Sequence, residues 1–211
     1  MRPVDLYTVM RVAGQVRAFR PDPVPDSTVA RALEHARFAP SGGNRQGWHV
    51  IVVKDGERRR ALRDLHLAQH HAYVASSAHR GAARGDSFAE RLDEIPVHLL
   101  VLVDLRALAL LDESLPRPSI VGGASIYPFV QNLLLGLRNE GLGGAITTLV
   151  VGAEPEVKAM FEIPEDFAVA ALVLCGWPRD RLPTRLARNS VTSFATTDSF
   201  VGPAFDQVAA S

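Results

Sequence analysis

The most constraining feature of this sequence is the apolar segment between Ile120 and Leu137. It is apolar on nearly every side of a helical projection, which in a water-soluble chain requires burial on most sides. It contains Pro128, Gln131 and Asn132 and falls short of the ~20 apolar residues that a membrane-spanning helix needs. Because a 211-residue protomer offers little interior to such a helix, we expect burial in a homodimer interface.

Composition limits the chain to one globular unit and excludes several classes of partner. The 211 residues are 47% hydrophobic and 22% charged, which suits a single domain over 1–211 with a sizeable core. Because 23 Lys and Arg balance 23 Asp and Glu, a broad nucleic-acid-binding surface is not expected. The only cysteine, Cys175, is expected in the core. This cysteine usage and the lack of an apolar leader at the N-terminus point to a cytoplasmic protein.

Hydrophobic periodicity predicts an α+β fold in which helices cover both faces of one sheet. Segment 76–95, rich in Ser, Ala, Gly and Arg, is expected to be largely a mobile loop, and 189–211 a C-terminal extension. Helices are expected at 3–13, at 26–38, after Gly56, at 119–139 and at 155–161, and strands at 49–54, 96–104, 143–151 and 168–175.

The segment Ala39–Trp48 joins a predicted helix to a predicted strand through small residues. Pro40 ends the helix because its ring restricts the preceding residue and it lacks an amide donor. Gly42 and Gly43, with their polar neighbours, then form a turn in which backbone amides can approach a flat polar ligand closely. A plain connection is the alternative, so this interpretation depends on the other segments described below.

Several familiar cofactor and catalytic motifs are missing from the sequence. No G-x-G-x-x-G turn follows the first predicted strand, and Gly141–Gly144 follows a helix instead, which argues against a dinucleotide-binding Rossmann fold. No Walker sequence is present, and Ser41 lacks the strand-turn-helix context of a nucleophilic serine. His66 and His70 have no neighbouring Cys, Asp or Glu at ligand spacing. We therefore expect surface histidines rather than a metal site.

Four segments, in this order, resemble the FMN-dependent nitroreductase superfamily. They are Gln15–Phe19 with its V-R-x-F, Ala39–Trp48 with A-P-S-x-x-N-x-Q-x-W, Glu140–Ala145 with G-L-G, and Gly176–Pro178 followed by two arginines, Arg185 and Arg188. The resemblance spans residues 8 to 191. It implies a three-layer α+β fold with a mostly antiparallel central sheet, and a homodimer with FMN at each subunit junction.

The same resemblance implies which residues contact the cofactor. Arg17 would stabilise the negative charge that reduction leaves at the pyrimidine end of the flavin. Arg185 and Arg188 would hold the phosphate, which guanidinium groups bind well, although a solvated basic tail is the alternative for both. The glycines after the long helix would meet the ring, and the small-residue turn would reach the FMN of the partner subunit. The predicted set is Arg11, Arg17, Pro40, Ser41, Gly42, Gly43, Asn44, Gln46, Gly143, Gly144, Ala145, Arg185 and Arg188.

The chain also departs from the family pattern. Many relatives carry Arg-Arg-Ser just before the V-R pair, where this chain has Ala13, Gly14 and Gln15. One usual phosphate ligand is therefore missing, and Arg11 is the candidate replacement, with Arg20 as a second candidate. Gly47 stands where a proline often precedes the tryptophan. The resemblance identifies no residue for the flavin N3 edge.

The leading functional hypothesis is an FMN oxidoreductase that passes hydride from NAD(P)H through flavin N5 to a conjugated electrophile such as a nitroaromatic or quinone. A flavin-binding sensor or carrier with little turnover is one alternative. Another chemistry of the same scaffold, such as dehalogenation, flavin fragmentation or heterocycle oxidation, is a second, and an interaction domain without cofactor is a third. No catalytic side chain, metal or membrane partner is expected, because the flavin carries the redox chemistry.

Overall fold

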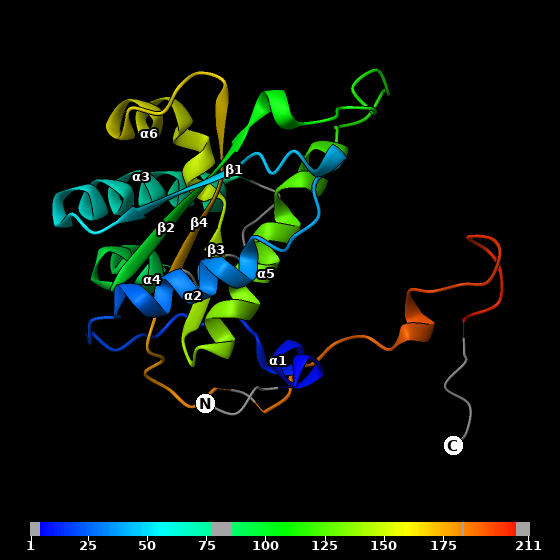
Figure 1. The fold of residues 1–211 in the computed structure, drawn as a ribbon, viewed down its shortest axis with the longest axis horizontal. Coiled ribbons are helices and arrows are strands. Elements are labelled where there is room, and N and C mark those ends of the chain that lie inside the picture. The colour runs from blue at the N-terminus through cyan, green and yellow to red at the C-terminus, as the bar shows by residue number, and fades with distance from the viewer. Residues whose placement is uncertain (1–4, 77–85, 183, 206–211) are drawn as a thin grey trace.

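A four-stranded antiparallel sheet forms the centre of the computed structural model, which describes residues 5–76, 86–182 and 184–205 (Figure 1). The strand order is β1-β2-β4-β3, so the first and third strands of the chain form the two edges. All strand pairs are antiparallel, which confirms the predicted fold class. The strands are β1 (Trp48–Val53), β2 (Val97–Asp104), β3 (Gly143–Thr147) and β4 (Phe167–Gly176).

Helices cover both faces of the sheet, which completes the three predicted layers. Helices α2 (Asp26–Ala36) and α5 (Tyr127–Asn139) lie on one face, and α3 (Gly56–Ala75) and α6 (Glu154–Phe161) on the other (Figure 1). Apart from His98 and its last residue, Asp104, the central strand β2 is apolar, because it contributes side chains alternately to both layers. Its Leu99 and Leu100 are fully buried in opposite core clusters.

Two shorter helices, α1 and α4, complete the α-helices of the described residues. Helix α1 (Leu6–Val12) begins at Asp5, whose carboxylate accepts a hydrogen bond from the Thr8 amide at 3.0 Å. The predicted loop at 76–95 is described from residue 86, where the chain forms α4 (Asp86–Glu90) and then a 3₁₀ turn at Leu92–Glu94. Residues 77–85 lie outside the described residues.

The predicted helix at 119–139 is wrong at its N-terminal end, because α5 begins only at Tyr127. A 3₁₀ turn at Val121–Ser125 precedes it. The buried Asp112 carboxylate accepts hydrogen bonds from the Ile120 amide at 2.9 Å and the Ser119 hydroxyl at 2.7 Å, and these bonds hold the pKa of Asp112 well below its usual range. These interactions divert the backbone before residue 121. Pro128 then occupies the first turn of α5, where its missing amide donor costs nothing.

Helices α2 and α5 pack unusually closely because of one glycine. A Cβ atom at Gly136 would lie 2.9 Å from the Ala32 carbonyl oxygen and 3.1 Å from the His35 Cβ atom. A larger residue at this position would push the two helices apart. The glycine therefore fixes how closely α2 covers α5.

Two histidines on α3 are buried, and the prediction that they lie at the surface is wrong. His66 is 3% exposed and His70 is 6% exposed. His66 Nε2 lies 3.0 Å from the Thr147 hydroxyl at the end of β3, which supplies a polar partner inside the core. The prediction for Cys175 is confirmed, since the thiol is fully buried and burial raises its pKa to about 12.

The C-terminal part of the chain leaves the sheet and extends away from the rest of the molecule (Figure 1). Its described part includes a 3₁₀ turn at Val191–Ser193 and an isolated bridge between Thr196 and Ala204. Large apolar side chains on it face outward, with Phe200 98% and Phe194 71% exposed. None of the described helices is both long and apolar enough to cross a bilayer.

Candidate cofactor site

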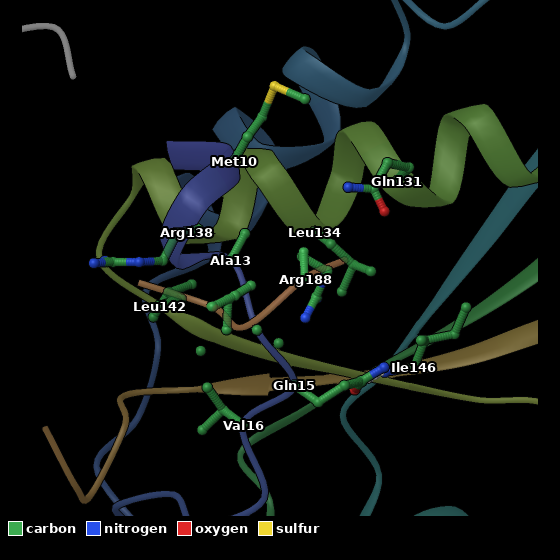
Figure 2. A pocket seen from close by; sticks show the side chains of 14 residues that line it. Met10, Ala13, Gln15, Val16, Gln131, Leu134, Arg138, Leu142, Ile146 and Arg188 are labelled. Carbon is green, nitrogen blue, oxygen red and sulfur yellow. Dashed lines mark hydrogen bonds between the residues drawn. The ribbon is translucent and has the colours of Figure 1, made fainter. Parts of the chain in front are cut away.

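A pocket of about 420 Å³ lies where the N-terminal segment, α5, β3 and the basic tail meet (Figure 2). This volume falls within the range typical of small-molecule and cofactor sites, roughly 300 to 1,000 Å³. Figure 2 shows Arg188 between the α5 side chain of Leu134 and the amide of Gln15, which lies beside β3. Among its lining residues, the predicted ones are Gly143, Gly144 and Arg188.

Backbone atoms form the pocket wall next to β3, because glycines there let the neighbouring segments pack closely against the strand. The Val16 amide donates to the Gly144 carbonyl oxygen at 2.9 Å, so the N-terminal segment lies along the edge of β3. A Cβ atom at Gly143 would lie 2.8 Å from Val16, and one at Gly144 would lie 2.9 Å from Leu134. The two glycines therefore allow close packing on both sides of the strand and leave backbone at the pocket wall.

Arginines gather at the pocket and in an adjoining hollow of about 710 Å³. The hollow is lined by Arg11 and Arg185 and shares Arg188 with the pocket. The Leu186 amide donates to the Arg11 carbonyl oxygen at 2.9 Å, which ties the basic tail to the end of α1. Three predicted phosphate ligands thus lie together, and their guanidinium groups suit a bound anion.

The packing around Gly14 explains why this chain has a small residue where many relatives carry an arginine. A Cβ atom there would lie 2.8 Å from the Leu186 side chain, so the tail occupies the space that a longer residue would need. Ala13 beside it also lines the pocket. The short residues at 13 and 14 thus leave Arg11 and the tail arginines Arg185 and Arg188 as the nearby cations predicted from sequence.

Sequence reasoning missed three pocket residues on α5: Gln131, Leu134 and Arg138. Their spacing of three and then four residues places them on one stripe of the helix. Arg138 Nε is buried and has no hydrogen-bond partner among the described residues. Two polar side chains seven residues apart in an apolar helix were the available signal for this stripe.

Arg17 does not line the pocket. It borders a separate small hollow of about 50 Å³ together with Arg91, Arg179 and Phe88. Ala145, another predicted residue, is 2% exposed and belongs to the core cluster on the α3 side of the sheet. The structure therefore places neither side chain beside Gly144.

The predicted turn at Pro40–Gln46 lies near the opposite end of α5. The Gly42 amide donates to the Ser125 hydroxyl at 3.0 Å, just before this helix begins, whereas the pocket residues of α5 run from Gln131 to Arg138. A helical rise of 1.5 Å per residue places Ser125 roughly 9 Å along the axis from Gln131 and roughly 20 Å from Arg138. The turn is ordered by a 2.9 Å bond from the Gln46 amide to the Ser41 hydroxyl and by positive φ at Gly43, Asn44 and Gln46.

Comparison with known proteins agrees with this fold and these motifs. The sequence profile of the Nitroreductase family matches residues 15–177. The chain is 33% identical over 182 residues to the 5,6-dimethylbenzimidazole synthase of Rhodospirillum rubrum, covering 80% of this chain and 79% of that protein. It is 29% identical over 205 residues to an NADH dehydrogenase of Thermus thermophilus, covering 84% and 88%.

The fold is also found among solved structures. A crystal structure of oxidized iodotyrosine deiodinase bound to FMN and 3-iodo-L-tyrosine superimposes with a TM-score of 0.71 and 24% identity, covering 93% of this chain and all of that one (100%). At this identity the likeness concerns the fold alone. The profile match across most of the sequence shows that this chain belongs to the nitroreductase family, and the fold likeness agrees with it.

Proposed function

We propose that the protein is an FMN-dependent oxidoreductase that uses NAD(P)H, and that the pocket beside β3 holds the flavin. The observation that carries the proposal is the meeting of the strand glycines Gly143 and Gly144 with a cluster of tail arginines in one pocket. Membership of the nitroreductase family and the FMN-bound structure of a fold relative support it.

The described residues fit the chemistry of FMN. Arg188 at the pocket, with Arg185 and Arg11 in the adjoining hollow, would bind the phosphate dianion through charge-assisted hydrogen bonds. The backbone at Gly143 and Gly144 would lie against the flat ring, since no Cβ stands in the way. Arg17 would need to turn from its own hollow to face the ring, so its role at the pyrimidine end stays a prediction.

When bound, FMN would supply hydride transfer at N5 between NAD(P)H and an electron acceptor. The residues of the chain orient the two reactants and restrict access of water to the pocket. The described lining residues of the pocket include no Asp, Glu or His. We therefore assign no acid or base to this part of the chain, and solvent would provide the proton for the reduced product.

We further propose that the active form is a homodimer. The turn at Pro40–Gln46 contacts the start of α5 and contributes no residue to the described lining of the pocket, which begins on α5 at Gln131. Tyr127 on α5 is 45% exposed and the preceding Ile120 is 73% exposed, which leaves apolar surface for a partner to cover. A twofold arrangement along α5 would bring the turn of one chain to the pocket of the other. Size-exclusion chromatography with light scattering tests this, and a monomer that retains bound flavin would contradict it.

The acceptor is proposed to be a conjugated electrophile such as a nitroaromatic or quinone. The relatives named above include a dimethylbenzimidazole synthase and a deiodinase, so flavin fragmentation and dehalogenation are the second candidate activities. The flavin chemistry and the single buried cysteine suit the reducing cytoplasm as the site of action.

The decisive experiment measures flavin content and reduction. Purified protein should be yellow or take up added FMN, and the colour should bleach when NADH or NADPH is added under argon. Air or a nitroaromatic should restore the colour, and product analysis with each acceptor separates reductase from deiodinase activity. Protein that takes up no FMN would refute the proposal, whereas tight FMN binding without NAD(P)H oxidation would indicate a sensor or carrier.

A further inference from the structure

Arg138 lies in the last turn of α5 and lines the candidate cofactor pocket (Figure 2). Its Nε atom is buried and has no hydrogen-bond partner, and no described residue forms an ion pair with its guanidinium group. The next carboxylate along the chain, that of Glu140, is already bound by Arg31 at 2.7 Å. Arg138 is therefore a cation with a buried donor that the described residues leave without an acceptor.

This unmet donor indicates a ligand rather than a structural role. A buried N–H of a charged group is costly without an acceptor, because it has lost its contact with water and gained nothing in return. A cation in the last turn of a helix gains only a little from the helix dipole at a partly exposed site. The described pocket lining holds a second arginine, Arg188, and no Asp or Glu. Two positive charges in such a pocket suit an anionic ligand.

Neither residue expected from the sequence to replace the missing phosphate ligand lines the pocket. The Arg11 guanidinium belongs to the adjoining hollow and lies 5.5 Å from the centre of the Tyr7 ring. Arg20 pairs with Asp22 at 3.3 Å. The cations of the described pocket lining are therefore Arg188 and the arginine of α5.

We propose that Arg138 binds the phosphate group of FMN and supplies, from α5, the positive charge that the N-terminal segment of this chain lacks. The proposal rests on the proposed function, since the pocket must hold FMN. Figure 2 shows the guanidinium group on the Leu142 side of the pocket and away from Gln15. It can therefore contact one end of the nucleotide rather than its whole length. The phosphate oxygens would accept the hydrogen bond that Nε cannot make within the described protein.

Two substitutions test the charge and the donor of this side chain. Arg138→Met keeps a similar length and removes both, whereas Arg138→Lys keeps the charge but not the planar group of donors. Arg37 follows the last residue of α2 and lies outside the pocket, so Arg37→Met removes a positive charge from another helix end and serves as the control. The measurements are the dissociation constants for FMN and for riboflavin, and urea unfolding of the flavin-free proteins.

We expect Arg138→Met to weaken FMN binding by about 10-fold or more and to change riboflavin binding little, because only FMN carries the phosphate. Arg138→Lys should lose less affinity, since the charge remains. Flavin-free Arg138→Met should be at least as stable as the wild type, because an apolar group replaces a buried donor without an acceptor. Arg37→Met should keep the wild-type affinity for both ligands.

Wild-type affinity for FMN in Arg138→Met would overturn the assignment, and so would equal losses for FMN and riboflavin, which would indicate a packing effect. A flavin-free Arg138→Met protein that is less stable than the wild type would show that Nε has an acceptor within the protein, and would also overturn it. A loss in Arg37→Met as large as that in Arg138→Met would reveal a general effect of net charge and count against the proposal. Failure of the proposed function is distinct, because the wild-type protein itself would then bind no FMN.

Discussion

Two of the buried histidines, His66 on α3 and His98 on β2, should make this protein sensitive to mild acid. His66 is 3% exposed and His98 is fully buried at 0%, and burial lowers the pKa of each to about 4. His98 Nε2 donates to the Leu92 carbonyl oxygen at 2.9 Å, so a second proton would have to bind Nδ1. No described residue accepts a hydrogen bond there, and the nearby Arg59 guanidinium opposes a positive charge more than Asp93 offsets it.

The size of the effect follows from proton binding. In the unfolded chain a histidine takes up its proton near pH 6.5, whereas these two stay neutral in the folded chain until about pH 4. Their stabilising contribution is therefore complete above pH 6.5 and is lost as the pH falls toward 4. Each site contributes about 1.4 kcal/mol per pH unit in that window, or about 3 kcal/mol per histidine over the whole window. Total stabilities are only about 5 to 15 kcal/mol, so the loss should be large.

The assay is urea unfolding at several pH values between about 7.5 and about 4.5, with and without His98→Leu. The free energy of unfolding of the variant should fall less steeply with decreasing pH, because its unfolding takes up about one proton fewer. This difference in slope is expected whatever the stability of the variant at neutral pH. His71→Gln replaces an exposed histidine on the same helix as His66 and should keep the wild-type decline. A wild-type free energy of unfolding that is flat across this range, or an unchanged decline in His98→Leu, would refute the reasoning.

Three further predictions concern single residues. Arg188→Ala should weaken FMN binding by about 10-fold or more and leave riboflavin binding nearly unchanged, because it removes a charge-assisted bond to the phosphate; equal losses for both ligands in fluorescence titrations would contradict the assignment. Gly136→Val should lower the free energy of unfolding by about 1–3 kcal/mol in urea titrations, since its side chain would meet the Ala32 backbone; wild-type stability would show that α2 and α5 separate without strain. Cys175, with its pKa raised to about 12, should react with a thiol reagent such as DTNB only after denaturation, and rapid modification of the native protein would disprove its burial.

Elements with a strong local pattern could be predicted from the sequence. Strand β2 is almost uniformly apolar because both its faces are covered, and its predicted range, 96–104, differs from Val97–Asp104 by one residue. The end of α5 was similarly clear because Glu140 and Gly141 stop the helix, and Gly141 adopts a positive φ of 83°. In both cases the information lies within a few residues of the element.

Features that depend on distant contacts could not be predicted. The beginning of α5 depends on Asp112, which binds the Ile120 amide from outside the helix. The burial of His66 depends on Thr147, 81 residues further along the chain. In the candidate site, the arginines were visible as a basic tail. Their meeting with Gly144, however, depends on how the tail packs over Gly14, which a local pattern does not reveal.

The distance between the Pro40–Gln46 turn and the pocket along α5 has a genetic consequence. If each site takes its turn from one chain and its pocket from the other, a chain defective only in the turn and a chain defective only in the pocket can complement each other. A mixed dimer of the two would contain one site with both defects and one site with neither. Co-expression of two inactive alleles would then restore up to half of the activity per mixed dimer, which no arrangement with the site inside a single chain allows.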